Sequence, residues 1–313
     1  MSWLTWLKRI FQILFYGAIF LFVLGPATMP LNDPKEQIRA YTRAEEFDYI
    51  DWTIDALAVK LDRATLGTSG YLELEEQKQV VLEYIDLIGQ IRTAEAELSM
   101  VYADPQISDP ENAAAPIREK LAPLYARRDE IAPLSESIIQ QMVSTTAARL
   151  GFTAGGQPVP PVMYHNTPLP WALIVSPRDE IRQEANISLE TRLTVEDHIQ
   201  IEDQISADLG YSTLVVPIGG VGTYPTMVAE TTSLNWLMEV ISHEWMHNYL
   251  SLRPLGVRYD LTPELRTINE TTASIFGTEL GAEIIRTYFP EFAPPPPAPP
   301  SEDTTDQPAP EPP

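Results

Sequence analysis

The pentapeptide His243-Glu244-Trp245-Met246-His247 has the form HExxH and uses two of the four histidines in the chain. The spacing of apolar residues around it predicts a helix. Positions i and i+4 of a helix share one face, so both imidazoles can reach one metal ion. Glu244 can then reach a water in the open coordination position of that metal. The motif therefore predicts a catalytic metal site carried by a helix.

The sequence also marks both ends of this helix. Thr231-Thr232-Ser233 offers an N-cap, because a hydroxyl can accept a hydrogen bond from a free N–H group of the first turn. The region from Leu250 to Pro254 marks the end. The predicted apolar face consists of Leu234, Leu237, Met238 and Ile241. The motif thus falls in the middle of the helix, where side-chain positions are well defined.

A catalytic zinc ion needs three protein ligands and one open position, so two imidazoles are too few. The other two histidines, His165 and His198, precede the motif. The carboxylates after the motif that could supply the third ligand are Asp260, Glu264, Glu270, Glu279 and Glu283. Thr262-Pro263 predicts the start of a second helix, an N-cap followed by proline at the first helical position. Glu270 falls about two turns into that helix and is the predicted third ligand.

HExxH followed by Asn269-Glu270-Thr271-Thr272-Ala273-Ser274 resembles the gluzincins, the thermolysin-like metallopeptidase superfamily. The resemblance covers roughly residues 214–288, under a third of the chain. It implies zinc as the cofactor, His243, His247 and Glu270 as its ligands, and Glu244 as the general base. In that family a carboxylate often stands four residues after the third ligand and binds a ligand histidine; here that position is Ser274.

Peptide hydrolysis at such a site also needs a hydrogen-bond donor for the developing oxyanion. Tyr259 is the predicted donor, and His198, Arg258 and Arg266 are further candidates. An aromatic side chain packed at a loop is the alternative interpretation of Tyr259. An extended substrate could pair with an edge strand, either 226–230 or 214–218.

Composition excludes several classes of protein. The net charge is −23, and carboxylates occur along the whole chain, which disfavours nucleic-acid binding. The chain has no cysteine, so disulfides, thiolate metal sites and thiol nucleophiles are excluded. A peptide or protein is the expected partner, and the sequence predicts neither its identity nor the oligomeric state.

The N-terminal segment 1–32 is predicted to be a membrane anchor. Lys8-Arg9 precedes a run from Ile10 to about Met29 that is long enough to span a bilayer. Trp3 and Trp6 lie where an interfacial aromatic belt would be. The sequence thus predicts a single-pass protein of the cell membrane with an extracytoplasmic catalytic domain. A cleaved signal peptide and a buried core helix are the alternatives.

The rest of the chain predicts an α+β fold with a helical region at 33–150 and a zincin-like domain with a small mixed sheet at 151–290. Apolar stripes predict helices around 47–61, 74–101 and 116–150, the last with kinks or a break at its prolines. These stripes are expected to form core. Strands are predicted at 171–175, 187–193, 214–218 and 226–230. The Pro-rich acidic tail, 291–313, is expected to be disordered.

Two other functions fit the same residues. One is a membrane-tethered binding or scaffold protein with a structural or degenerate zinc site, in which His198 or Asp260 would complete the ligand set. The other is a metallohydrolase that acts on a non-peptide bond. The helical region 33–150 could also be a propeptide, although no cleavage signal is visible.

Overall fold

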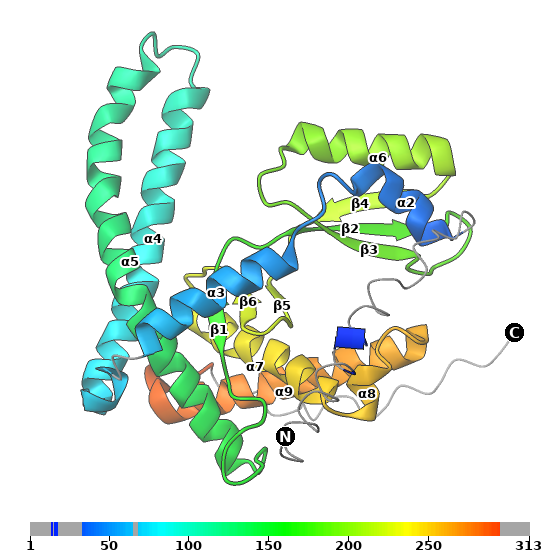
Figure 1. Cartoon of the computed structure of the whole chain (residues 1–313). Helices are drawn as coiled ribbons and strands as arrows, with labels where there is room; N and C mark the ends of the chain where they lie inside the picture. The colour runs from blue at the N-terminus through cyan, green and yellow to red at the C-terminus, as the bar shows by residue number, and fades with distance from the viewer. Residues whose placement is uncertain (1–13, 15, 18–32, 65–67, 295–313) are drawn as a thin grey trace, which may run out of the picture. The chain divides into compact units, whose positions relative to one another are not determined.

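The computed structural model describes residues 14, 16, 17, 33–64 and 68–294, and about 64% of them are helical (Figure 1). The chain divides into two compact units. The small unit lies within Met1–Phe47 and Trp171–Val216, and the large unit within Asp48–Pro170 and Pro217–Pro313. The small unit contains α2 (Pro34–Thr42), β2 (Trp171–Ser176), β3 (Ala185–Leu189), α6 (Val195–Leu209) and β4 (Ser212–Val216). The elements of the large unit are α3 (Tyr49–Ala64), η1 (Thr68–Tyr71), α4 (Leu74–Ala103), α5 (Pro110–Arg149), β1 (Tyr164–Asn166), β5 (Gly220–Val221), β6 (Thr226–Val228), α7 (Leu234–Ser251), α8 (Pro254–Val257), α9 (Pro263–Tyr288) and η2 (Pro290–Phe292).

The small unit is an antiparallel sheet of order β3-β2-β4 with α2 and α6 on one face (Figure 1). Alternate strand residues such as Leu173 and Leu189 meet Ile38 of α2 and Ile205 of α6 in one apolar core. Helix α6 was not predicted from the sequence. It begins at a capping box in which Thr194 and Asp197 exchange hydrogen bonds, a local signal that the sequence did contain.

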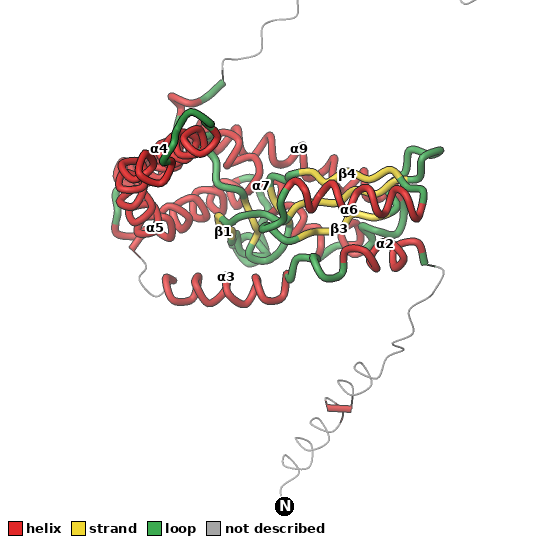
Figure 2. The backbone as a smooth tube through the Cα atoms, turned by 90° about the horizontal axis from the view of Figure 1, so that it is seen from above, coloured by secondary structure: helices red, strands yellow, loops and turns green. Residues whose placement is uncertain are grey.

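In the large unit, α4 and α5 pack along each other as a long antiparallel hairpin, which Figure 2 shows nearly end-on. The apolar stripe predicted for α4 is buried in this contact from Val81 to Ile91. Helix α5 runs for 40 residues through three internal prolines, so the predicted break is wrong. Burial of its apolar residues against α4 stabilises the helix despite the hydrogen bonds that proline cannot make.

The second part of the large unit carries the HExxH motif. Helices α7 and α9 pack on each other, and a sheet of order β1-β6-β5 lies beside α7 (Figure 1). Strand β6 is the central strand, parallel to β1 and antiparallel to β5. The shared core includes Ile241 and Trp245 of α7 and Leu280 and Ile284 of α9.

Helix α3 departs from the expectation that apolar stripes form core. Ile50, Ile54 and Leu61 are 75%, 61% and 70% exposed. The buried side of the helix instead contains Ala56. The period of the stripe therefore predicted the helix correctly and its buried face wrongly.

The predicted fold class needs correction. The chain is mostly helical with two small three-stranded sheets, instead of α+β with an N-terminal transmembrane helix. In the described part of the chain, no helix has the length and apolarity needed to cross a membrane. This finding corrects the prediction of a single-pass membrane protein; most of the predicted anchor, 1–32, lies outside the described residues. The compact units also cut across the predicted boundaries, because 34–42 packs with the strands of the small unit.

Candidate metal centre

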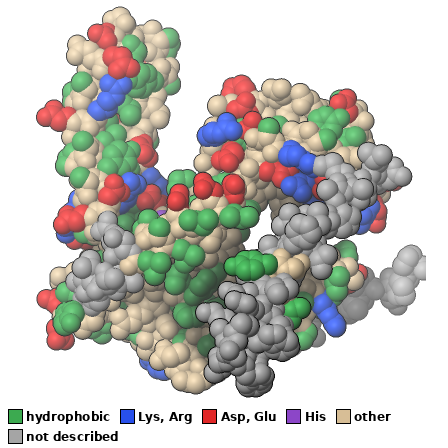
Figure 3. Space-filling model, viewed as in Figure 1, with side chains coloured by type: hydrophobic (Ala, Val, Ile, Leu, Met, Phe, Trp, Pro, Cys, Tyr) green, Lys and Arg blue, Asp and Glu red, His purple; other side chains and the backbone are tan. Residues whose placement is uncertain are grey.

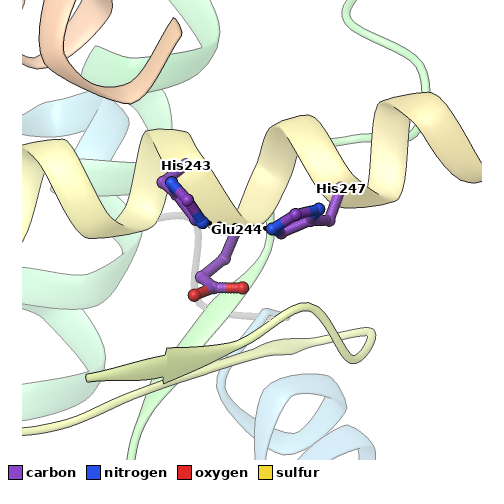
Figure 4. Close-up of side chains that lie close together, drawn as sticks. All are labelled: His243, Glu244 and His247. Carbon is purple, nitrogen blue, oxygen red and sulfur yellow. Dashed lines mark hydrogen bonds between the residues drawn. The ribbon is translucent and has the colours of Figure 1, made fainter. Parts of the chain in front are cut away.

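The two motif histidines face each other on successive turns of α7 (Figure 4). Their Nε2 atoms are 3.1 Å apart. Ser233 caps the helix by accepting a hydrogen bond from the Trp236 N–H group, as the sequence predicted. Burial of Trp245 on the opposite side of α7 fixes the rotation of the helix about its axis, which aims both imidazoles at one point.

Glu270 reaches the same point from α9. Its Oε2 atom lies 3.7 Å from His243 Nε2 and 3.5 Å from His247 Nε2. Thr262 caps α9 and Pro263 occupies the first turn, as predicted. The structure thus brings together two histidines of α7 and a carboxylate of α9.

These three atoms fit the donor set of a zinc ion. Ligands of a tetrahedral zinc with bonds of about 2.0–2.1 Å lie about 3.4 Å from one another, close to the 3.1, 3.5 and 3.7 Å observed. Two imidazole lone pairs at 3.1 Å repel each other unless a proton or a cation lies between them. Nitrogen and carboxylate donors in this arrangement suit zinc.

Glu244 completes the cluster. Each of His243, Glu244 and His247 offers a potential ligand atom within 4.8 Å of the others. The Glu244 carboxylate points away from α7, toward the strand that contains Gly220 (Figure 4). The residue is 8% exposed. Burial raises the pKa of Glu244, although the two histidines oppose this shift. A carboxylate with a raised pKa is a better proton acceptor near neutral pH.

Glycines allow the neighbouring backbone to approach these side chains closely. A Cβ atom added to Gly220 of β5 would lie 2.7 Å from Glu244 Oε1. One added to Gly277 of α9 would lie 2.9 Å from His243 Cβ. Both distances are too short for a real contact, so these positions tolerate only glycine without a shift. The sequence did not predict a role for either glycine.

Asn269 orients one of the histidines. Its Oδ1 accepts a hydrogen bond from His247 Nδ1 at 2.8 Å, which leaves the Nε2 lone pair free for a metal. Asn269 Nδ2 donates to the carbonyl of Leu255 and so fixes the amide orientation. Asn269 is 1% exposed, whereas Ser274 is exposed. Asn269 thus makes the contact with a ligand histidine that, in the gluzincins, a carboxylate four residues after the third ligand often makes.

Tyr259 contacts the predicted third ligand. Its hydroxyl donates a hydrogen bond to Glu270 Oε1 at 2.5 Å. Burial and this hydrogen bond raise the pKa of Tyr259, so the phenol stays protonated. Tyr259 thus holds Glu270 in place in the described structure, and its role as oxyanion donor stays a prediction.

The charges of the cluster are coupled. Hydrogen bonds with His243 and His247 hold the pKa of Glu270 well below its usual range. Burial lowers the pKa of His247, but Glu270 and Glu244 more than offset this, and the net shift is upward. Glu270 is thus an ionised carboxylate beside two imidazoles, the state in which it can bind a cation.

The other candidates have different partners. Asp260 pairs with Arg266 at 2.8 Å, and Glu283 pairs with Arg286 at 2.8 Å. His165 binds Glu136. His198 belongs to the small unit, where its ring packs on Trp171. The edge strand next to the site is β5, because β6 is central and β4 belongs to the other sheet.

Comparison with protein-family models, with curated proteins and with solved structures found no match to this chain. The resemblance to gluzincins therefore stays a prediction from the motif and its spacing.

Proposed function

We propose that this protein is a zinc-dependent metallopeptidase. His243, His247 and Glu270 would hold the zinc, and Glu244 would act as the general base. The observation that supports this most is the convergence of three donor atoms at separations of 3.1, 3.5 and 3.7 Å, with a buried carboxylate beside them. A site of three protein ligands leaves one coordination position for water or substrate.

When bound, zinc would lower the pKa of a water molecule toward neutrality and polarise a substrate carbonyl. Glu244 would accept a proton from the attacking water as the bond between its oxygen and the peptide carbon forms. The same carboxylate, then protonated, would give the proton to the leaving nitrogen as the C–N bond breaks. The burial of Glu244 supports both proton transfers. It raises the pKa of the carboxyl group toward neutral pH, where the group can both accept and donate a proton.

Strand β5 supports a peptide over a non-peptide substrate. It forms the edge of the sheet β1-β6-β5 in the described structure, and its Gly220 lies directly over Glu244. An extended peptide can add to a sheet edge through main-chain hydrogen bonds. This would place a scissile bond beside Glu244 without any demand on a particular side chain.

The experiment that tests the proposal combines metal analysis with hydrolysis of a quenched fluorescent peptide library. The wild type should bind about one zinc ion per chain and cleave peptides. Glu244→Gln should keep the zinc and lose about 10²–10⁴-fold in rate, because the base is lost and the ligands remain. His243→Ala should lose both the zinc and the activity.

The matched control is His198→Gln, which changes a buried histidine of the small unit and should leave zinc content and rate unchanged. Zinc retention in Glu270→Ala would contradict the third-ligand assignment. If the wild type binds zinc and cleaves no peptide, a binding or scaffold protein with a structural zinc site is favoured. If it cleaves only a non-peptide ester or amide, a metallohydrolase that acts on a non-peptide bond is favoured.

A further inference from the structure

Helix α3 presents a regular apolar stripe to the outside. Ile50, Ile54, Leu57 and Leu61 follow a 4-3-4 spacing, which places them on one face of a helix. Three of the four are 61–75% exposed, and Leu57 is half-buried. A contiguous exposed apolar face of this kind marks an interaction surface more often than a scattered single residue does.

The opposite face of α3 is anchored by polar contacts. Lys60 forms an ion pair with Glu136 of α5, whose side chain is 3% exposed. The indole N–H group of Trp52 donates to the Thr167 hydroxyl at 3.3 Å. A rotation that buried the stripe would leave the Glu136 carboxylate without Lys60 in the interior, which is costly. The outward direction of the stripe is therefore set by the contacts of the helix itself.

One edge of the stripe is acidic. Asp51 and Asp55, one turn apart, are both exposed, and Asp48 precedes the helix. Lys60, on the other side of the stripe, is paired with Glu136. In Figure 3, hydrophobic side chains lie over α3 with a row of acidic side chains along one edge. The exposed surface thus combines an apolar centre with negative charge on one side.

We propose that this α3 surface, formed by Ile50, Ile54, Leu57 and Leu61 with Asp51 and Asp55, docks an amphipathic helix of another protein that carries Lys or Arg beside its apolar stripe. The apolar stripes pack on each other, and the basic edge lies along the aspartates. A second copy of this chain fits less well, because antiparallel pairing of two such faces brings the acidic edges together. Both copies also carry a net charge of −23.

The test uses the full chain and two synthetic helical probes, a leucine-striped peptide edged with lysine and the same peptide edged with glutamate. Fluorescence anisotropy should show binding of the lysine peptide. The double variant Ile54→Ser/Leu61→Ser should weaken binding at least about tenfold, since it removes apolar contacts from the centre of the surface. Asp51→Asn/Asp55→Asn should reduce the preference for lysine over glutamate.

The matched control is Met100→Ser/Leu150→Ser, which removes two side chains that are 64% and 52% exposed and lie outside α3. This variant should bind the lysine peptide as the wild type does. All the variants should have the thermal unfolding midpoint of the wild type. Equal binding by Ile54→Ser/Leu61→Ser would overturn the proposal. A wild-type dimer in sedimentation that this variant dissociates would instead assign the surface to a second copy. Zinc content and hydrolysis should not change, so this test is independent of the proposed catalytic function.

Discussion

The two units of this chain bury their side chains in different ways. The small unit has an apolar core of the expected kind, in which strand residues alternate and the buried polar residues are Thr42 and His198. The large unit contains all the other buried polar residues of the described chain, namely Ser135, Glu136, Thr146, Thr226, Ser242, Glu244 and Asn269. Buried polar groups cost stability unless they are hydrogen-bonded, so each is expected to have a hydrogen-bond partner or a functional role.

The difference is consistent with the proposed metal centre in the large unit. There, Glu136 is surrounded by partners, whereas Glu244 is buried with its carboxylate facing glycine backbone. Glu136 belongs to a structural ion pair, and the surroundings of Glu244 fit the general base that we propose. Four predictions test this comparison, beginning with the largest expected effect.

Glu136→Gln should destabilise the protein by about 3–5 kcal/mol, because it leaves Lys60 unpaired in the interior. Urea unfolding would measure the change. The counterpart in the small unit is Glu46→Gln, which breaks a more exposed pair with Arg39 and should cost about 1 kcal/mol. Equal losses in the two variants would contradict the distinction between a buried and a surface ion pair.

Gly220→Ala should reduce peptide hydrolysis by about 10²-fold, because the added methyl group pushes Glu244 away from its position. The matched control is Gly89→Ala in α4, where an added Cβ makes an ordinary 3.7 Å contact with Thr232. That variant should keep the wild-type rate. Steady-state kinetics on the same peptide distinguishes the two, and an unimpaired Gly220→Ala enzyme would show that the strand does not position Glu244.

Asn269→Ala should weaken zinc binding by about 10–100-fold, since His247 loses the partner that orients its ring. Competition with a chelator of known affinity measures the effect. Ser274→Ala is the control, because this exposed side chain stands where gluzincins often have a carboxylate. A larger loss in Ser274→Ala than in Asn269→Ala would reverse the assignment.

The pH dependence of unfolding gives the smallest effect. Burial raises the pKa of Glu136, but Lys60 and His165 more than offset this and hold it below its usual value of 4.5. The ionised Glu136 carboxylate therefore stabilises the native state fully at a pH above 4.5, the usual pKa of the group. This stabilisation is lost as the pH falls through the lower pKa that Glu136 has in the folded state. The difference in unfolding free energy between the wild type and Glu136→Gln should stay constant from pH 7 to about 5 and shrink in acid. A constant difference at pH 3 would contradict the lowered pKa.

Local signals in the sequence predicted much of the structure around the proposed metal centre. The caps at Ser233 and Thr262 and the helix carrying HExxH are confirmed, since caps and 3.6-residue periods act within a few turns of chain. His243, His247 and Glu270 lie close together in the structure, and their role as metal ligands and the activity stay predictions. Helix α6 was not predicted, although Thr194 and Asp197 form a capping box at its start. For α5 the sequence predicted kinks or a break at the prolines, and the break is absent because the helix packs along α4.

The sequence by itself predicted the residues of the proposed metal centre and determined that α7 and α9 are helices, because spacing and caps are properties of neighbouring residues. Tertiary structure alone decided that Asn269 and not Ser274 orients His247, and that Tyr259 holds Glu270. It also decided that α3 turns its apolar stripe outward. Each of these depends on contacts between residues from separate elements or on the anchoring of a helix by a distant partner. No periodicity within one segment encodes such contacts.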